Sequence, residues 1–120
     1  MFARILSMQL KPNASAEFVE LFEKTIVSTL REQSGFKDEM LFVTPGGPEV
    51  VAISLWESRE TAERYHRTTY PELLKALTKV IERGPAVGTF QLAYSTLHEK
   101  GAVAFPPQSP NTTAPSGVGA

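Results

Sequence analysis

The residues best suited to chemistry gather in one short stretch, SLWESRETAERYHRTTYPELL, which holds Trp56, Tyr65, His66 and Tyr70. Trp56 is the only tryptophan of the chain. An imidazole titrates near neutral pH, so His66 could act as a general base and take a proton from a phenolic substrate. A tryptophan ring could hold a flat aromatic substrate by stacking. This composition predicts either a reaction site for an aromatic molecule or the wall of a small hydrophobic core.

Each of these residues has a structural alternative. A tryptophan that ends a strand is also typical of a core or an interface, and a tyrosine is often an amphipathic core residue. Because neighbours on a helix point roughly 100° apart, we expect one of Tyr65 and His66 to face inward and the other to face the rim. We interpret His66 and Tyr65 as candidate catalytic residues, and Trp56, Tyr70 and Tyr94 as candidate substrate-binding residues.

Composition excludes several other chemistries. The chain has no cysteine, which rules out disulfides, thiol catalysis and zinc–thiolate sites. His98, the second histidine, lies far along the chain from His66 and near the end of the last predicted strand, so spacing predicts no metal site. A net charge of −1 gives no basic footprint for nucleic acid. We therefore predict no metal and no nucleic-acid partner.

The elements that would position these residues follow from hydrophobic periodicity. Residues 2–10 alternate as a strand, with a large-residue face made of Phe2, Arg4, Leu6, Met8 and Leu10. Residues 14–35 have helical spacing, with a stripe made of Phe18, Leu21, Phe22, Ile26 and Leu30. Asn13 or Ser15 can cap this helix at its start, and Gly35 can close its end.

Residues 37–58 predict two strands joined by a PGGP turn. Their apolar runs, MLFV and VVAISLW, are nearly continuous, whereas an antiparallel strand with one wet face should alternate. Both faces of the sheet are therefore expected to be covered. Helices can cover only one of them, so we predict that a second copy of the chain covers the other and forms a homodimer.

Residues 58–84 predict a second helical region that Ser58 and Thr61 open, that breaks near Pro71 and that Gly84 and Pro85 close. Residues 87–99 alternate again, with Phe90, Leu92 and Tyr94 on one side. The order is therefore βαββαβ. It predicts an α+β, ferredoxin-like fold with a four-stranded antiparallel sheet and helices on one face.

Length and composition bound the domain. The chain of 120 residues predicts one domain over residues 1–100 and a disordered tail, rich in Pro, Gly, Ser and Thr, over residues 101–120. The N-terminal sequence carries Arg4 and does not resemble a signal peptide. No apolar run approaches the length of a membrane span. We predict a cytoplasmic protein with no membrane partner.

With these elements in place, the chain resembles the antibiotic biosynthesis monooxygenase family. The resemblance lies in LKP, FVELFEKTI, the Gly35 and Phe36 pair, and above all LWES…TAERYHRTTYPE. Trp56 and Glu57 match an aromatic–acidic pair that ends the third strand in the family, and Tyr65 and His66 match a second element on the following helix. The resemblance implies a dimeric α+β barrel, with two sheets face to face and a pocket between sheet and helices in each subunit.

The resemblance also implies an activity, a cofactor-independent monooxygenase acting on a small aromatic or quinol substrate. In such chemistry the deprotonated substrate itself reduces dioxygen, and the protein supplies a dry pocket, a base and a donor that stabilises the anion. The alternative is a non-catalytic or stress-related dimeric barrel that binds a small apolar ligand. Pocket polarity separates them, since an enzyme needs His66 or a tyrosine hydroxyl facing an otherwise apolar cavity.

A haem-degrading branch of the same superfamily is not expected here. That branch resembles this chain in fold, but it uses an Asn in the first strand, a Trp on the second helix and an axial His further along. The matching positions hold Leu6, Tyr65 and the pair of Lys75 and Ala76. The resemblance therefore implies no haem.

Overall fold

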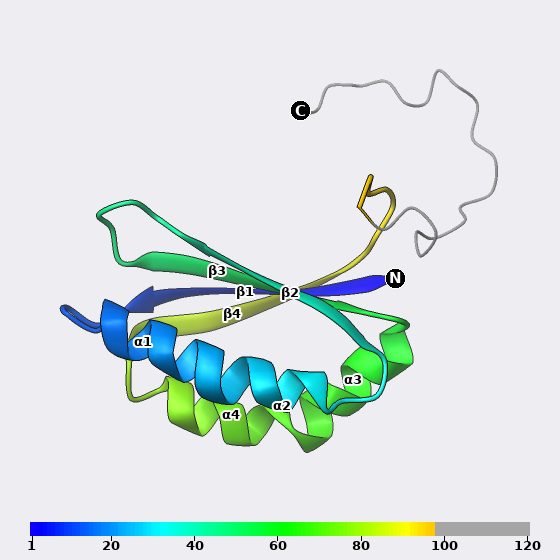
Figure 1. The fold of residues 1–120 in the computed structure, drawn as a ribbon, viewed down its shortest axis with the longest axis horizontal. Helices are drawn as coiled ribbons and strands as arrows, with labels where there is room; N and C mark the ends of the chain where they lie inside the picture. Colours follow the sequence, from blue (N-terminus) through cyan, green and yellow to red (C-terminus); the bar gives the residue numbers. More distant parts are fainter. Residues whose placement is uncertain (98–120) are drawn as a thin grey trace.

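The structure is a computed structural model that describes residues 1–97; the predicted tail, residues 101–120, and His98 lie outside the described residues. Four strands form one sheet in the order β2-β3-β1-β4, in which every neighbouring pair is antiparallel. The helices lie on one face of that sheet (Figure 1). The predicted α+β, ferredoxin-like arrangement is confirmed. The elements are β1 (Phe2–Leu10), α1 (Ser15–Leu21), η1 (Phe22–Ile26), α2 (Val27–Arg31), β2 (Phe36–Val43), β3 (Glu49–Trp56), α3 (Arg59–Thr68), α4 (Tyr70–Leu77) and β4 (Ile81–Gln91).

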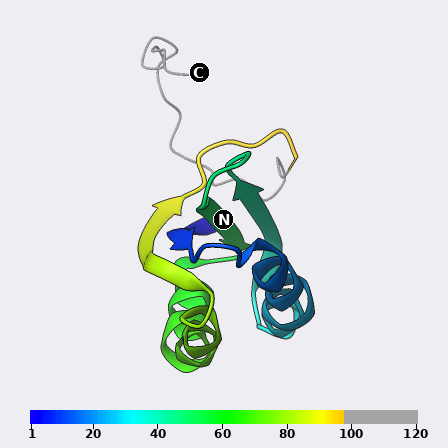
Figure 2. The same ribbon diagram turned by 90° about the vertical axis from the view of Figure 1, so that its left-hand side faces the viewer.

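The helices form two rows beneath the sheet. Figure 2 shows α3 and α4 under the edge formed by β4, and the continuous α1–η1–α2 row under the opposite edge. Each row is amphipathic, with an apolar stripe on one face only. The row packs against the sheet through that stripe. The space enclosed by the two rows and the sheet holds the core.

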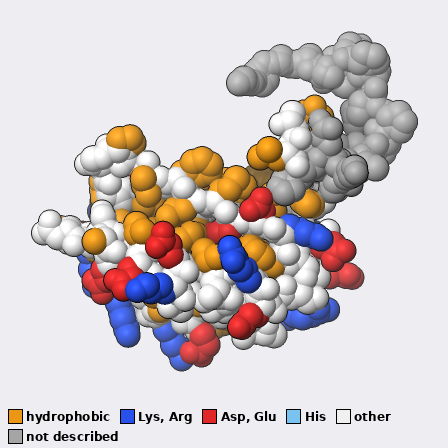
Figure 3. Space-filling view, viewed as in Figure 1, with side chains coloured by type: hydrophobic (Ala, Val, Ile, Leu, Met, Phe, Trp, Pro, Cys, Tyr) orange, Lys and Arg blue, Asp and Glu red, His pale blue; other side chains and the backbone are white. Residues whose placement is uncertain are grey.

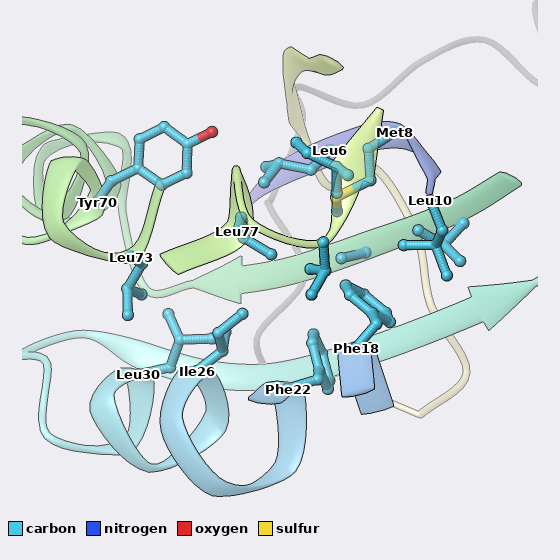
Figure 4. Close-up of a cluster of buried hydrophobic side chains, with 14 of the residues drawn as sticks. Leu6, Met8, Leu10, Phe18, Phe22, Ile26, Leu30, Tyr70, Leu73 and Leu77 are labelled. Carbon is cyan, nitrogen blue, oxygen red and sulfur yellow. The ribbon is translucent and has the colours of Figure 1, made fainter. Parts of the chain in front are cut away.

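The core begins with the alternation of β1. The predicted large-residue face of this strand is buried throughout, and it includes one charged residue, Arg4. Opposite it lie the apolar stripes of both helical rows (Figure 4). Burying one large aliphatic or aromatic side chain contributes about 1.5–3 kcal/mol relative to leaving it in water. The buried stripe residues are Phe18, Phe22, Ile26, Leu30, Leu73 and Leu77.

The first helical row contains a π-helical turn, η1, between α1 and α2. The buried residues Phe18, Phe22, Ile26 and Leu30 recur every fourth position. On an α-helix that spacing drifts by about 40° per step. A turn with more residues takes up this drift and keeps the stripe on the sheet. The predicted cap was wrong, because Ala14 precedes α1 and no side chain caps it.

The second helical row breaks at Thr69, as Pro71 predicts, and resumes as α4. Ser58 and Thr61 open α3 as predicted, and they do so as a capping box: the Ser58 hydroxyl accepts from the Thr61 amide, and the Thr61 hydroxyl accepts from the Ser58 amide. Gly35 has a positive φ of 84°, and a Cβ there would lie 2.5 Å from Thr61, so only glycine allows this approach of α3. Local signals and one close contact therefore place α3 on the sheet.

The last strand begins earlier than the sequence predicts. α4 ends at Leu77, and β4 runs from Ile81 to Gln91, so Gly84 and Pro85 lie inside a strand instead of closing a helix. The pairing register between β1 and β4 shifts around this point, from Ser7 with Ala86 to Gln9 with Arg83. β4 is an edge strand, where a bulge that contains glycine and proline is tolerated. The local helix-stop signal was therefore misleading.

The face of the sheet away from the helices remains apolar. We call this the open face. It carries Phe42 and Phe90, each more than half exposed, and the partly exposed pair of Ile5 and Ile53. In Figure 3 the hydrophobic side chains gather on the sheet side, and the charged side chains gather over the helices. The predicted covering of this face by a second copy stays a prediction. No helix within residues 1–97 has the length and hydropathy needed to cross a bilayer.

Candidate active site

A row of polar side chains crosses the helix-facing side of the sheet. Ser54 on β3 is paired with Glu39 on β2 and with Arg4 on β1, and Arg4 is paired with Thr89 on β4. Paired residues of antiparallel strands point to the same face, so these four residues form one line across all four strands. We call Glu39, Ser54, Arg4 and Thr89 the polar row. It interrupts a face that is otherwise largely apolar.

Arg4 is the centre of this row and is only 3% exposed. Its guanidinium carbon lies 4.6 Å from the ring centre of Tyr70 and 5.1 Å from that of Tyr65. These cation–π contacts compensate part of the lost hydration. Burial lowers the pKa of Arg4, and the neighbouring Tyr65 and Tyr70 oppose that shift. A guanidinium stays charged in proteins, so the row holds a buried cation.

His66 meets Arg4 from α3. An Nη2–H of Arg4 donates to Nδ1 of His66 over 3.0 Å. Arginine has only donors, so Nδ1 must be the acceptor and the proton of the neutral ring sits on Nε2. Partial burial and the charge of Arg4 both lower the pKa of His66. The ring also stacks on Tyr70, with centroids 5.3 Å apart. A ligand would therefore meet an Nε2–H donor, and Nδ1 could take a proton only after Arg4 releases it.

Behind Arg4 lies a set of packed rings, which we call the aromatic block: Phe36, Trp56, Tyr65 and Tyr70. Trp56 is fully buried and stacks on Tyr65, with ring centroids 4.9 Å apart. Its Nε1–H donates to the Ser54 hydroxyl over 2.9 Å, which satisfies the buried indole. Burial raises the pKa of both Tyr65 and Tyr70, so their hydroxyls remain protonated. Two rings of the block, those of Tyr65 and Tyr70, pack directly against the Arg4 guanidinium.

Glu39 ends the polar row on β2. Burial raises its pKa to about 8; Arg4 opposes this shift, and Asp38 adds to it. Its Oε1 atom is buried and has no hydrogen-bond partner. An ionised carboxylate oxygen without a partner would be costly in such a place. Near neutral pH the carboxyl is therefore mainly protonated, although an acid with its ordinary pKa would be ionised.

A cavity of about 300 Å³ opens beside this row, between α3 and the strands β1 and β4. Its volume is at the lower end of the range for small-ligand pockets and suits a compact aromatic molecule. The polar groups facing it are those of Arg4, Glu63, His66 and Thr89, and the remaining wall is apolar. Its lining residues are Phe2, Arg4, Ala62, Glu63, His66, Val87 and Thr89.

A larger cavity, of about 540 Å³, lies at the other end of the sheet. It is bounded by the segment after β1, the start of α1 and the PGGP turn. Among its lining residues only Lys11 is charged, and none carries an imidazole or a carboxyl. The smaller cavity is therefore the better candidate for chemistry.

The structure brings together most of the residues predicted from sequence. Tyr65, His66 and Tyr70 contact Arg4, and Trp56 stacks on Tyr65 behind them. As predicted, one of the two helical neighbours faces inward and the other lies at the rim: Tyr65 is buried and His66 is exposed. Only His66 of these lines the cavity. Tyr94 follows the end of β4, is 70% exposed and is not among the residues that line the cavity.

Sequence reasoning missed Arg4 and Glu39 as site residues. A usable signal existed for Arg4, because a lone charge on the large-residue face of an alternating strand must be buried with the others. Glu39 carried no comparable signal, since it lies in a polar KDE run. Among residues 1–97, no three His, Asp or Glu side chains gather as a metal ion would require.

Comparison with protein families places this geometry in context. Residues 1–79 match the family described as antibiotic biosynthesis monooxygenase. Among proteins with curated descriptions, none matches the chain.

Solved structures share the fold at low sequence identity. SnoaB of Streptomyces nogalater, a cofactor-independent oxygenase, is 22% identical with a TM-score of 0.67, covering 82% of this chain and 97% of its own. A monooxygenase from the gene ActVA-Orf6 of Streptomyces coelicolor, in complex with nanaomycin D, is 21% identical with a TM-score of 0.64, covering 74% and 84%. NE2512 of Nitrosomonas europaea, of unknown function, is 12% identical with a TM-score of 0.64, covering 79% and 91%.

Proposed function

The chain belongs to the antibiotic biosynthesis monooxygenase family, and on that premise we propose that it is a cofactor-independent monooxygenase that oxidises a small aromatic or quinol substrate. The supporting observation is the Arg4–His66 pair, which joins a buried cation to a neutral imidazole at the wall of a mainly apolar cavity. These are the groups that an anionic intermediate and its proton would need.

The proposed reaction converts a phenol with a para C–H bond into a quinone. His66 receives the phenolic proton at Nδ1 once the Arg4 N–H turns from the imidazole to the substrate oxygen. The resulting phenolate donates electrons to dioxygen at the para carbon, where a C–O bond forms. The O–O and C–H bonds then break, one oxygen stays as the new carbonyl, and the other leaves as water with two substrate hydrogens. The substrate supplies all four electrons.

The other predicted residues support this pair indirectly. The Tyr65 and Tyr70 rings hold the guanidinium by cation–π contact, and Trp56 packs behind Tyr65. In this arrangement they position Arg4, and the substrate itself meets Phe2, Val87 and the rim of α3. Tyr65, a candidate catalytic residue from sequence, is therefore proposed as a positioning residue.

Oxygen uptake with a panel of small phenols and polycyclic quinols, each with a hydroxyl group para to a C–H bond, tests this function. Substitution His66→Ala should lower turnover about a hundredfold, the usual contribution of a general base. Substitution Arg64→Gln, on the exposed side of the same helix, should leave turnover unchanged and serves as the control. Full turnover by His66→Ala would remove His66 from the mechanism.

A second function, non-catalytic binding of a small apolar ligand, is favoured by one observation. Trp56, Tyr65 and Tyr70 are almost completely buried and do not line the cavity, as expected of a core. Absence of oxygen uptake across the panel, together with ligand binding in the cavity, would select this alternative.

We also propose that two copies pair through the open face. The exposed Phe42 and Phe90 and the neighbouring aliphatic side chains make this face costly to leave in water. A stable interface buries about 800 Å² on each partner. Sedimentation should show a dimer, and Ile53→Lys, a charge in the middle of β3, should dissociate it. A well-folded monomer of the unaltered chain at micromolar concentration would contradict this pairing.

A further inference from the structure

The charge of Arg4 has no ion-pair partner in the part of the chain that the structure describes. The ion pairs found there join Lys24 to Glu20, Arg59 to Glu63 and Lys75 to Glu72, all on the surface. Arg4 instead contacts two tyrosine rings and a neutral imidazole. A buried cation of this kind attracts either an acidic side chain or an anionic ligand.

The acidic side chain that acts on Arg4 is Glu39. It lies two strands away in the polar row, with Ser54 between the two. The two side chains form no ion pair, but the negative charge of Glu39 raises the pKa of Arg4. The groups that act on Glu39 are Arg4 from β1, Tyr65 from α3 and Asp38 on its own strand. The buried Oε1 of Glu39 has no hydrogen-bond partner. Arg4 favours the ionised form of Glu39, but no hydrogen bond holds the buried Oε1 in that form, so the carboxyl can change its charge.

Glu39 does not line the cavity, and the titratable groups that do line it beside Arg4 cannot take its place. Glu63 lines the cavity from α3, but its carboxylate lies 3.6 Å from the Arg59 guanidinium, and both side chains are exposed to solvent. Exposed pairs are screened and interact weakly with a buried group. His66 accepts a hydrogen bond from Arg4 and is neutral in that arrangement. The protonation of Glu39 thus decides whether the charge of Arg4 is balanced from within the protein.

We propose that Glu39 sets the charge of the ligand that the cavity binds. With Glu39 protonated, Arg4 is uncompensated and the cavity prefers a planar aromatic anion, such as a phenolate or an ionised hydroxyquinone. With Glu39 ionised, the carboxylate balances Arg4 and this preference is lost. Glu39 itself does not touch the ligand; it acts through Arg4 as a positioning and specificity-determining residue. The inference rests on the proposed function only in that it uses the same cavity.

The direction of the pH effect follows from burial. Because the pKa of Glu39 is raised to about 8, the carboxyl is neutral below that pH and ionised above it. Affinity for an aromatic anion should therefore be high near neutral pH and fall as the pH rises through about 8. An ordinary glutamate, ionised well below neutral pH, would produce no change in this range.

Binding titrations with two matched probes test the proposal. The anionic probe is 2-hydroxy-1,4-naphthoquinone, which stays ionised throughout the range, and the neutral probe is 2-methoxy-1,4-naphthoquinone. Trp56, the only tryptophan, reports binding by fluorescence quenching, and calorimetry checks the values. Between about pH 6.5 and about pH 9.5 the Kd of the anionic probe should rise roughly tenfold. The Kd of the neutral probe should stay constant.

Three variants test whether the pH dependence of anion binding comes from Glu39 and Arg4. Substitution Glu39→Gln keeps the shape of the protonated acid and should hold the anionic probe equally well at both ends of the pH range. Substitution Glu32→Gln, which removes an exposed carboxylate, should keep the pH dependence of the unaltered chain. Substitution Arg4→Gln should weaken binding of the anion at every pH.

Two outcomes would overturn the proposal: the same pH dependence in Glu39→Gln as in the unaltered chain, or equal affinities of the two probes at low pH. If Glu39→Gln fails to fold, a flat profile of the anionic probe with the unaltered chain overturns it alone. Binding needs no turnover, so the two proposals fail separately. A pH-dependent preference for the anionic probe without oxygen uptake would support the role of Glu39 and contradict the monooxygenase activity. Oxygen uptake without a pH-dependent preference would support the activity and contradict the role of Glu39.

Discussion

The two ends of the core on the helix-facing side of the sheet are built from the same strand but differ in kind. Along β1, Leu6, Met8 and Leu10 pack against Phe18 and Phe22 in an aliphatic and aromatic end without charge (Figure 4). Two residues earlier on the same face, Arg4 packs among Tyr65 and Tyr70. The β1 side chains are buried at both ends, yet only the second end contains groups that can exchange protons.

This difference shows how one small domain separates stability from chemistry. The apolar end gains free energy from burial alone and has no polar group to satisfy. The Arg4 end must offset the desolvation of a cation and of a carboxyl, which costs stability. It can do so because the aromatic block still buries large apolar rings around them. Substitutions at the apolar end should therefore lower the free energy of unfolding and spare function, whereas substitutions at the Arg4 end should lower activity and spare stability.

The largest effect on stability is expected at the apolar end. Substitution Phe18→Ala removes a fully buried ring and should lower the free energy of unfolding by about 3–5 kcal/mol. Denaturant unfolding measures this loss, and Val19→Ala, at the partly exposed neighbouring position, should cost far less. Affinity of the folded protein for an aromatic ligand should not change. A large loss of affinity would show that the two ends are coupled.

At the other end, Arg4→Met should affect function and spare stability. Turnover of an aromatic hydroxyl substrate should fall by about 10²–10³-fold, as when a donor to a developing anion is removed. The free energy of unfolding should stay the same or rise, because an apolar side chain of similar length replaces a buried cation without an ion pair. Oxygen uptake and denaturant unfolding measure the two quantities.

A conservative control and one contrary result test this contrast. Substitution Arg4→Lys keeps the charge but loses the planar fork, so it should retain an intermediate activity. If Arg4→Met instead unfolds the protein, Arg4 is a structural residue of the core and the comparison between the ends fails.

A smaller effect is expected from Glu39, and it depends on pH. The folded pKa, about 8, lies above the ordinary value of 4.5, so the unfolded chain releases this proton first. The contribution of Glu39 is therefore fully present below about pH 4.5 and is lost as the pH rises to about 8. Because Glu39 is not completely buried, the loss should be about 2 kcal/mol.

Substitution Glu39→Gln should remove this dependence. The variant should be more stable than the unaltered chain above about pH 8, and the two should be alike below about pH 4.5. Thermal unfolding across the pH range measures the difference, with Glu32→Gln as the exposed control. Parallel stability curves for Glu39→Gln and the unaltered chain would show that the carboxyl titrates normally in the fold.

Local patterns along the chain were enough to predict most of the fold. The alternation of residues 2–10, the stripe of the first helical row, the helix start at Ser58 and the break near Pro71 all appear in the structure where they were expected. Each depends on residues within a few positions of one another. The same locality explains the error at Gly84 and Pro85, where a stop signal for a helix and a bulge in an edge strand use the same residues.

The amino-acid sequence by itself determined the order of the elements, the buried faces and the gathering of Trp56, Tyr65, His66 and Tyr70 near one another, because period and composition are properties of neighbouring residues. Only the tertiary structure decided that Arg4 meets His66, that Glu39 lies in the same row, and that one cavity opens beside them. Those facts depend on the register of strands far apart in the chain. A pKa depends in turn on what that register buries, so no local pattern around Glu39 could reveal it.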